Sequence, residues 1–484
     1  MAKDKFDFHA GLKKQILIVG IVGLVLLAVG AVMPSGGHGD DHGGDHATEH
    51  HDAGHGDDAH GGDDHHDDKG HDDGHGGDHQ EEKGHAEEGG HGGAPDFEYS
   101  GGGDEGHGHE KTWFDRFIID LWINNVYFTG LALIGIFFFA IQYAAQAGWS
   151  AYIIRIPLSM AHWIPIAGVL MIGSFLAFNH DIFHWTHSDL YEVGGAHFDS
   201  IIAGKAGYFF NPLGGGEGGF PIFYVVRLFI FFAVWYWLFT KLKNMSFAED
   251  ELGGESYWFG MRKWSAIFLV VFAVTSSISA WDWIMSIDTH WFSTMFGWYV
   301  FASWWVTGLA LITLIVILLR EAGYLSQVTE NHLHDLGKFV FAFSVFWTYI
   351  WFSQFLLIYY ANIPEESVYY VERLRSDHYS TYFFANVIMN FFFPFLCLMT
   401  RDAKRLHVFL KIACVVIIAG HWLDFFLMAT PGTLGESGAL GLTEIGMYLV
   451  FGAAFIYVTL NALSKRALVA PNHPMLDEAK HHHI

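Results

Sequence analysis

Cysteine is scarce in this chain, with 2 in 484 residues. Cys397 and Cys414 both lie in apolar stretches, and neither belongs to a C-x-x-C or C-x-x-C-H pattern. The chain itself therefore offers no thiolate metal site, no iron–sulfur ligand set and no c-type haem attachment. We expect both cysteines to be inert apolar residues in helices, not a disulfide.

Positive charge is also scarce, with 26 Lys and Arg against 51 Asp and Glu and a formal net charge of −25. Most of the imbalance lies in residues 38–110, so it does not indicate an acidic surface for a basic partner. Apolar residues are abundant instead: 52% of the chain is hydrophobic and 17% aromatic. This composition is too apolar for a soluble protein and predicts an all-α, polytopic membrane fold.

Ten apolar runs are long enough to span a membrane. A bilayer core of roughly 30 Å needs about 20 helical residues. The first run resembles a signal peptide, but it is long, and its small-x-small pattern lies inside the apolar stretch, so we expect a retained span. The ten runs are 16–33, 119–143, 157–178, 222–240, 264–287, 294–319, 338–360, 379–399, 406–428 and 442–463.

Lys and Arg alternate between the two sides of these spans. With the N-terminus in the cytoplasm, the cytoplasmic loops collect most of them, from Lys13 and Lys14 to Lys465 and Arg466. By the positive-inside rule, both termini are expected in the cytoplasm.

A low-complexity segment rich in His, Asp and Gly follows the first span and is expected outside the cytoplasm. It lacks the apolar residues needed to fold alone. Its imidazoles and carboxylates are consistent with a weak metal buffer, whereas the interpretation we adopt is a solvated insertion. The expected division is 1–33 (first span), 34–112 (insertion), 113–288 (first bundle), 289–430 (second bundle) and 431–484 (last span and tail).

Charged groups within spans are costly and mark candidate pathways. The fifth span carries Thr275, Ser279, Asp282 and Ser286 at spacings of +4, +3 and +4, which places them on one helical face. One interpretation is a proton path in which the hydroxyls donate to Asp282 or relay a proton. The other is that they satisfy a structural carboxylate.

A second group closes the ninth span, where His421 and Asp424 are three residues apart. A carboxylate beside an imidazole suits a proton relay, although a structural pair has the same spacing. Arg227 in the fourth span needs an anionic partner, which Asp282 or Asp424 would supply if the helices meet.

Two further groups are weaker candidates. His180, His184 and His187 would align on one side of a continuing helix and form a haem or zinc site, or a polar interface with a partner. Uncharged polar residues of the seventh and eighth spans are more typical of helix–helix contacts than of a pathway. They are Ser353, Gln354, Tyr382, Asn386 and Asn390.

Three stretches resemble a known family. They are "SISAWDWIMSIDTHWFSTMFGWYVF" (277–301), "YYANIPEE" (359–366) and "HWLDFFLMATPG" (421–432). They are similar to the integral membrane subunits of alternative complex III, the bacterial quinol:cytochrome c oxidoreductase, within the wider NrfD-like, polysulfide-reductase superfamily. Of the two such subunits, the chain is most similar to the second. The resemblance covers nearly all of the chain except the insertion, in which it departs from the family.

The resemblance implies two four-helix bundles, formed by spans two to five and six to nine, with two peripheral helices. It also implies a bacterial inner-membrane location. The implied partners are multihaem c-type cytochromes, an iron–sulfur subunit like molybdopterin oxidoreductases, the sister membrane subunit and lipids, with a terminal oxidase as a further candidate and no nucleic acid. Haem c and iron–sulfur clusters would belong to those partners, and no cofactor is expected on this chain except a quinol such as menaquinol.

Three functions follow as hypotheses. The leading one is a non-catalytic subunit that conducts protons and supports the quinol-oxidising sister. The second is that this chain itself binds and oxidises quinol. The third is a metal transporter, prompted by the His-rich insertion.

Overall fold

The computed structural model describes residues 5–32 and 111–483 of the chain. The His-rich insertion therefore lies outside the described residues. The described part contains no β-strand, and its only β-contact is an isolated bridge between Lys5 and Ala467. Ten of its helical segments are long and apolar enough to cross a membrane. The prediction of an all-α membrane protein with ten transmembrane helices is confirmed.

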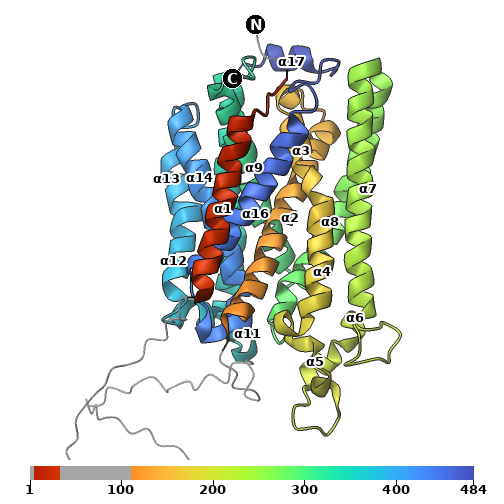
Figure 1. Ribbon diagram of the computed structural model, residues 1–484, viewed down its shortest axis with the longest axis vertical. Helices are drawn as coiled ribbons and strands as arrows, with labels where there is room; N and C mark the ends of the chain where they lie inside the picture. The colour runs from red at the N-terminus through yellow and green to blue at the C-terminus, as the bar shows by residue number, and fades with distance from the viewer. Residues whose placement is uncertain (1–4, 33–110, 484) are drawn as a thin grey trace, which may run out of the picture. The chain divides into compact units, whose positions relative to one another are not determined.

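Figure 1 labels most of the helices, which are numbered in chain order. The longer helices are α1 (Ala10–Val32), α2 (Trp113–Ala145), α4 (Ile164–Ile182), α7 (Ile222–Leu252), α8 (Glu255–Trp283), α9 (Phe296–Glu321), α10 (Glu330–Ala361), α11 (Pro364–Arg375), α14 (His407–Ala429) and α16 (Leu442–Leu463). The shorter ones are α3 (Arg155–Met160), α5 (Ser200–Gly204), α6 (Ala206–Phe209), α12 (Ser380–Val387), α13 (Phe393–Leu398), α15 (Pro431–Leu434) and α17 (Leu476–Lys480).

Two groups of four spans make up the protein interior. The first group packs α2, α4, α7 and α8 together, and the second packs α9, α10, α14 and the broken span of α12 and α13. The groups also contact each other, because α9 packs against both α2 and α8. The two four-helix bundles predicted from the family resemblance are therefore present and share an apolar core.

The first and last spans lie outside these bundles and pair with each other. Gly23 of α1 and Gly446 of α16 face each other so closely that a Cβ on either would lie within 3 Å of the other's carbonyl oxygen. Small residues allow helices to approach this closely in lipid. Most of the remaining α1 surface is exposed, as expected of a peripheral helix.

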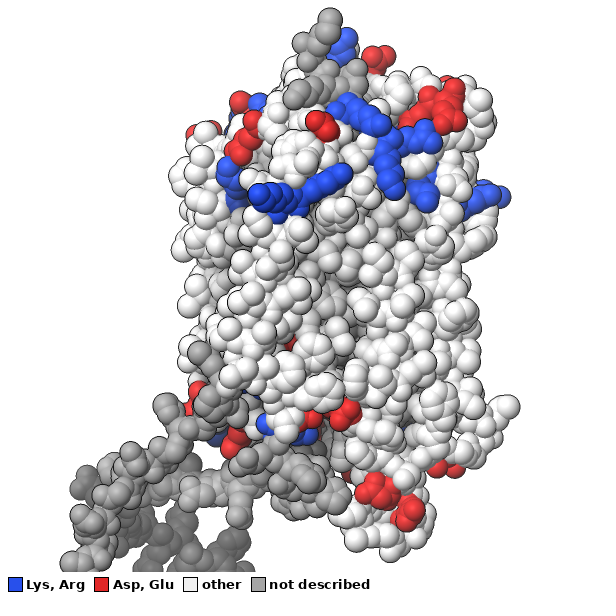
Figure 2. Space-filling model, in the orientation of Figure 1, with Lys and Arg blue, Asp and Glu red and all other residues white. Residues whose placement is uncertain are grey.

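Charged side chains gather toward the ends of the spans (Figure 2). On the face shown, Lys and Arg concentrate at the end where α17 lies, and a broad uncharged band separates them from the other end. We call the α17 end the basic end and the end bearing α5, α6 and α11 the loop end. The uncharged band is what a lipid-facing surface requires.

Candidate functional site

A buried carboxylate lies in the second bundle near the loop end. Asp424 of α14 is fully buried. It accepts hydrogen bonds from four uncharged donors on three helices: the Tyr299 hydroxyl, Ser303 Oγ at 2.9 Å, Trp347 Nε1 at 3.0 Å and Asn386 Nδ2 at 2.8 Å. Within the described residues, no Lys or Arg pairs with this carboxylate. Its charge is therefore balanced by dipoles alone, which fill its capacity of about four bonds.

Ser303 connects Asp424 to the imidazole of His421. The Ser303 hydroxyl lies 2.9 Å from His421 Nδ1 and 2.9 Å from Asp424 Oδ2, whereas the two ionisable groups are 3.7 Å apart. One hydroxyl can accept from one neighbour while donating to the other. A proton can therefore sit on His421 or on Asp424, with Ser303 exchanging its own proton as the charge moves.

At each end of this hydrogen-bond network, one polar atom lacks a hydrogen-bond partner within the described part of the chain. His421 Nε2 has none, and neither has Oδ1 of Asn390, whose Nδ2 bonds Asn386 Oδ1. Asn390 lies in a π-helical turn, Ile388–Phe392, a feature frequent at functional sites. A Cβ at residue 420 would lie 2.3 Å from Asn390 Oδ1, so Gly420 leaves room for this amide.

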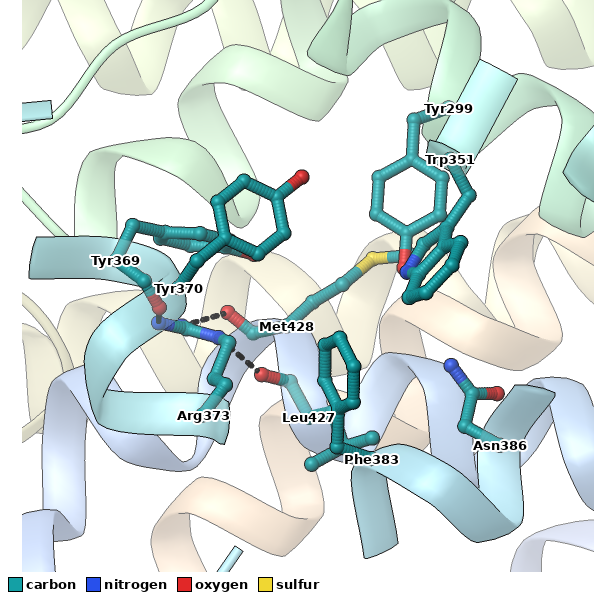
Figure 3. A pocket seen from close by; sticks show the side chains of 9 residues that line it. All are labelled: Tyr299, Trp351, Tyr369, Tyr370, Arg373, Phe383, Asn386, Leu427 and Met428. Carbon is teal, nitrogen blue, oxygen red and sulfur yellow. Dashed lines mark hydrogen bonds between the residues drawn. The ribbon is translucent and has the colours of Figure 1, made fainter. Parts of the chain in front are cut away.

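A pocket opens beside Asp424 toward the loop end (Figure 3). It holds about 280 Å³ of space not filled by atoms, part of it open to solvent. Tyr299 and Asn386, which both bond Asp424, line it together with rings from other helices. The remaining lining residues are Trp351, Tyr369, Tyr370, Arg373, Phe383, Leu427 and Met428. The aromatic walls of the pocket are therefore connected to the Asp424 carboxylate through Tyr299 and Asn386, which contact both.

Arg373 forms the polar side of this pocket. Its guanidinium donates to the carbonyl oxygens of Leu427, Met428 and Tyr369 and pairs with Asp288 at 2.9 Å. The adjacent Glu372 lies 3.4 Å from Arg373. Burial raises the pKa of Glu372 to about 7, although Arg373 opposes the shift. A carboxyl that titrates near neutrality thus lies beside Arg373.

In the first bundle, the structure pairs Arg227 of α7 with Asp282 of α8. Two hydrogen bonds of 2.8 Å join the guanidinium to both carboxylate oxygens. The rings of Tyr208 and Phe223 lie 4.3 and 4.7 Å from the guanidinium carbon. The predicted partner for Arg227 is therefore found, and Asp282 is held by a full positive charge, unlike Asp424.

The hydroxyls near Asp282 do not point to its carboxylate. Thr275, Ser279 and Ser286 donate instead to the main-chain carbonyls of Val271, Ser276 and Asp282. The side-chain hydroxyls therefore satisfy the helix backbone, the usual role of Ser and Thr in spans. Ser286 also lies beyond the end of α8, in a short 3₁₀ turn. These hydroxyls therefore do not satisfy the Asp282 carboxylate, and the proton path along this face stays a prediction.

The three histidines after the third span do not align on a helix. The helix α4 ends at Ile182, and a 3₁₀ turn follows. The ring of His187 lies 5.1 Å from that of His180 and 5.8 Å from that of His184. Among the described residues, no group of three or more metal-binding side chains is close enough to hold an ion. The weak metal candidates His180, His184 and His187 thus lack the required geometry.

The sequence interpretation overlooked several site residues. Tyr299 and Ser303 are four apart in the sixth span, a spacing that could have marked a polar face. In α2, buried Asp120, Asn124 and Asn125 also went unremarked, and Asn124 accepts a hydrogen bond from Trp422 Nε1 at 3.0 Å. The sequence did not indicate Trp347 as a site residue, because a tryptophan in a span ordinarily packs in the apolar core.

The uncharged polar residues of the seventh and eighth spans differ in their hydrogen-bond partners. Asn386 and Asn390 belong to the Asp424 network. The Tyr382 hydroxyl accepts a bond from the Leu440 amide. The buried amide of Gln354 finds no bond within the described ranges, and Ser353 lies beside it in sequence, partly exposed.

Comparison with known proteins adds no assignment. No family model matches the chain, and no curated protein matches it.

Proposed function

We propose that this protein is a proton-handling membrane subunit of a bacterial respiratory quinol:acceptor oxidoreductase. The observation that carries the proposal is the arrangement of Asp424, Ser303 and His421, an ionisable pair bridged by one hydroxyl inside a transmembrane bundle. Such groups are costly in a membrane interior and are typical of proton relays. In this proposal the relay centres on Asp424, with the Arg227–Asp282 pair as a second charged site in the other bundle.

The resemblance to alternative complex III membrane subunits supports the respiratory context. The two bundles have corresponding carboxylates, Asp282 on the last helix of the first and Asp424 on the last helix of the second. In the proposed assembly, the sister subunit oxidises quinol, and multihaem cytochromes and an iron–sulfur subunit receive the electrons. The basic end would face the cytoplasm of the inner membrane, as the positive-inside rule predicts.

Replacing Asp424 by Asn tests the relay in the assembled complex. The variant Asp424→Asn keeps an acceptor oxygen but cannot take up the relay proton, so proton release and coupled quinol turnover are expected to fall by roughly 100-fold or more. Ser303→Ala should produce a similar loss, because it removes the bridging hydroxyl.

The matched control is Ser277→Ala, a partly exposed serine on α8 whose hydroxyl bonds only its own helix. It should leave both rates unchanged. Wild-type proton release and turnover in Asp424→Asn would overturn the proposal.

A second candidate function is quinol binding by this chain itself. The aromatic pocket beside Asp424 favours it, because small-molecule sites combine apolar and aromatic walls with few polar groups. Tyr369, Tyr370 and Arg373 would then hold the ring, and Asp424 would accept a proton through Tyr299. Photolabelling the complex with an azido-quinone distinguishes the two. Exclusive labelling of another subunit removes this candidate, whereas labelling of the pocket residues supports it.

A further inference from the structure

A second buried carboxylate lies at the basic end, far from Asp424. Glu249, near the end of α7, has no exposed surface. Neither of its carboxylate oxygens has a hydrogen-bond partner in the described part of the molecule. A buried carboxylate without bonds is strongly disfavoured in its charged form. Glu249 must therefore hold a proton, contact water, or alternate between the two.

The neighbouring cation does not satisfy Glu249. Arg155 of α3 is itself buried and directs one guanidinium nitrogen to Asp250 and to the Ser246 carbonyl. Its Nε and Nη1 have no partner among residues 5–32 and 111–483. Unpaired donors of Arg155 and unpaired acceptors of Glu249 thus belong to one group of neighbouring polar residues. We call this group the chamber; its members are Tyr143, Arg155, Ser246, Glu249 and Asp250. Ordered water ordinarily fills such gaps between buried polar groups.

The C-terminal tail covers this chamber. Asn472 donates to the main-chain carbonyls of Glu249 and Asp250, at 3.3 and 3.0 Å. The ring of His473 lies 5.5 Å from that of Tyr143. Burial, followed by the charge of Arg155, lowers the pKa of His473 to about 4, so His473 is neutral at pH 7.

A small pocket lies directly beside the chamber. It contains about 210 Å³ of space not filled by atoms, part of it open to solvent. Its walls include Tyr143 and His473, so the space reaches the residues that surround Glu249.

We propose that Glu249 is a proton-exchange site at the basic end, reached by water through the pocket at Tyr143 and His473. The inference rests on the proposed proton-handling function, and it adds a proton-exchange site at the end of the molecule opposite Asp424. A hydronium or water at the pocket donates one proton to the Glu249 carboxylate, which becomes a neutral carboxylic acid. The reverse transfer returns the proton to water.

The groups around Glu249 act on its charge in opposite directions. Arg155 favours the carboxylate, whereas burial and the adjacent Asp250 favour the acid. The ionisable groups that surround the chamber are Tyr143 from α2, Arg155 from α3, Asp250 from α7 itself, and Arg466 and His473 from the tail.

Glu249 and Arg227 lie at opposite ends of the same helix. They are 22 residues apart on α7, which corresponds to roughly 33 Å of helix. No single proton transfer covers that length, so Glu249 and the loop-end groups are separate sites. This separation makes the two sites testable apart.

Infrared difference spectroscopy on the intact complex in lipid nanodiscs tests the inference. The C=O stretching band of a protonated carboxylic acid should appear at low pH, decline as pH rises and shift promptly in D₂O. In wild-type-minus-variant difference spectra, Glu249→Gln should remove one component of this band, whereas Glu251→Gln, an exposed neighbour paired with Arg466, should leave that component in place. Tyr143→Phe should displace the midpoint of the titration while the band persists.

Two outcomes would overturn the inference: a Glu249→Gln spectrum with no component missing at any pH, or a missing component that is insensitive to pH and D₂O in the wild type. The last would identify a static buried acid. These readouts require no quinol turnover. A titrating Glu249 band together with an active Asp424→Asn complex would therefore remove the proposed relay and leave this site in place.

Discussion

At the scale of residues, two carboxylates in equivalent helices are stabilised by different means. Asp282 is matched by the full charge of Arg227, whereas Asp424 is surrounded by hydroxyl, indole and amide groups. A fixed cation stabilises the Asp282 carboxylate, whereas neutral hydrogen-bond donors stabilise that of Asp424. The first site is therefore an ion pair, and the second is a carboxylate held by uncharged groups beside His421.

The Arg227–Asp282 pair should behave as a buried ion pair. Arg227→Met or Asp282→Leu alone leaves an uncompensated charge and is expected to cost roughly 3–5 kcal/mol of unfolding free energy. The double variant should be much closer to wild type, because neither charge remains. Thermal unfolding of the protein in detergent measures all three.

The control is an exposed pair on the same molecule. Lys411 and Glu321 bond at 2.8 Å with about a third of each side chain exposed. The corresponding changes, Lys411→Met and Glu321→Leu, should each cost less than about 1 kcal/mol. Equal losses at both pairs would show that Arg227 and Asp282 are not desolvated.

The sequence identified ionisable groups better than their partners. Asp282, Arg227, His421 and Asp424 stand out because charge is rare in apolar runs. Ser303 and Trp347 do not stand out, since hydroxyls and indoles are common in spans and only packing sets which way they face. The hydroxyls of Thr275 and Ser279 show the same limit, because helical spacing does not decide between a carboxylate and a main-chain carbonyl.

At the scale of elements, α11 shows how a short helix closes the second bundle. It is amphipathic, and its buried side presents Tyr369, Tyr370 and Arg373. Arg373 caps the carbonyls at the end of α14, which would otherwise lack partners. The docking of α11 therefore depends on one buried cation and the acids beside it, Asp288 and Glu372.

The titration of Glu372 makes this docking pH-dependent. In the folded protein, the Glu372 carboxyl retains its proton up to about pH 7, whereas an unperturbed Glu carboxyl releases its proton near pH 4.5. Stability should therefore fall as pH rises from 5 to 8, by about 1–3 kcal/mol. Glu372→Gln should remove this part of the dependence, while Glu365→Gln, exposed on the same helix, should keep it. Unfolding midpoints in detergent at several pH values provide the measurement, and an unchanged slope in Glu372→Gln would refute the assignment.

Helix positions followed from hydropathy, but helix lengths did not. All ten expected spans are present, yet α7 continues to Leu252 and α8 begins at Glu255, beyond the apolar runs 222–240 and 264–287. Hydropathy marks only the residues that face lipid or core. Polar residues extend both helices past the apolar runs at the basic end, and Glu249 lies in the extension of α7.

At the scale of the whole molecule, the described chain has a charged or ionisable site toward each end of its spans. Asp282 and Asp424 lie toward the loop end, and Glu249 lies toward the basic end. No sequence periodicity relates these positions, because they are on different helices. Only the packing of α2, α3 and the tail around α7 reveals the basic-end chamber.

The membrane-subunit proposal predicts stable partners. Mild detergent extraction from the native membrane, with a tag on this chain, should recover haem-containing proteins in fixed ratio. Reduced-minus-oxidised spectra and mass spectrometry identify them. Recovery of this polypeptide alone, without haem or quinol-dependent activity, would remove the respiratory assignment while leaving the fold unaffected.

The contact between Gly23 and Gly446 has a consequence for biogenesis. The helix α1 has α16 as its main neighbour, and α16 follows more than 400 residues later in the chain. During translation, α1 must therefore wait in the lipid bilayer without its partner. Seating of α1 against α16 thus follows synthesis of all the spans between them.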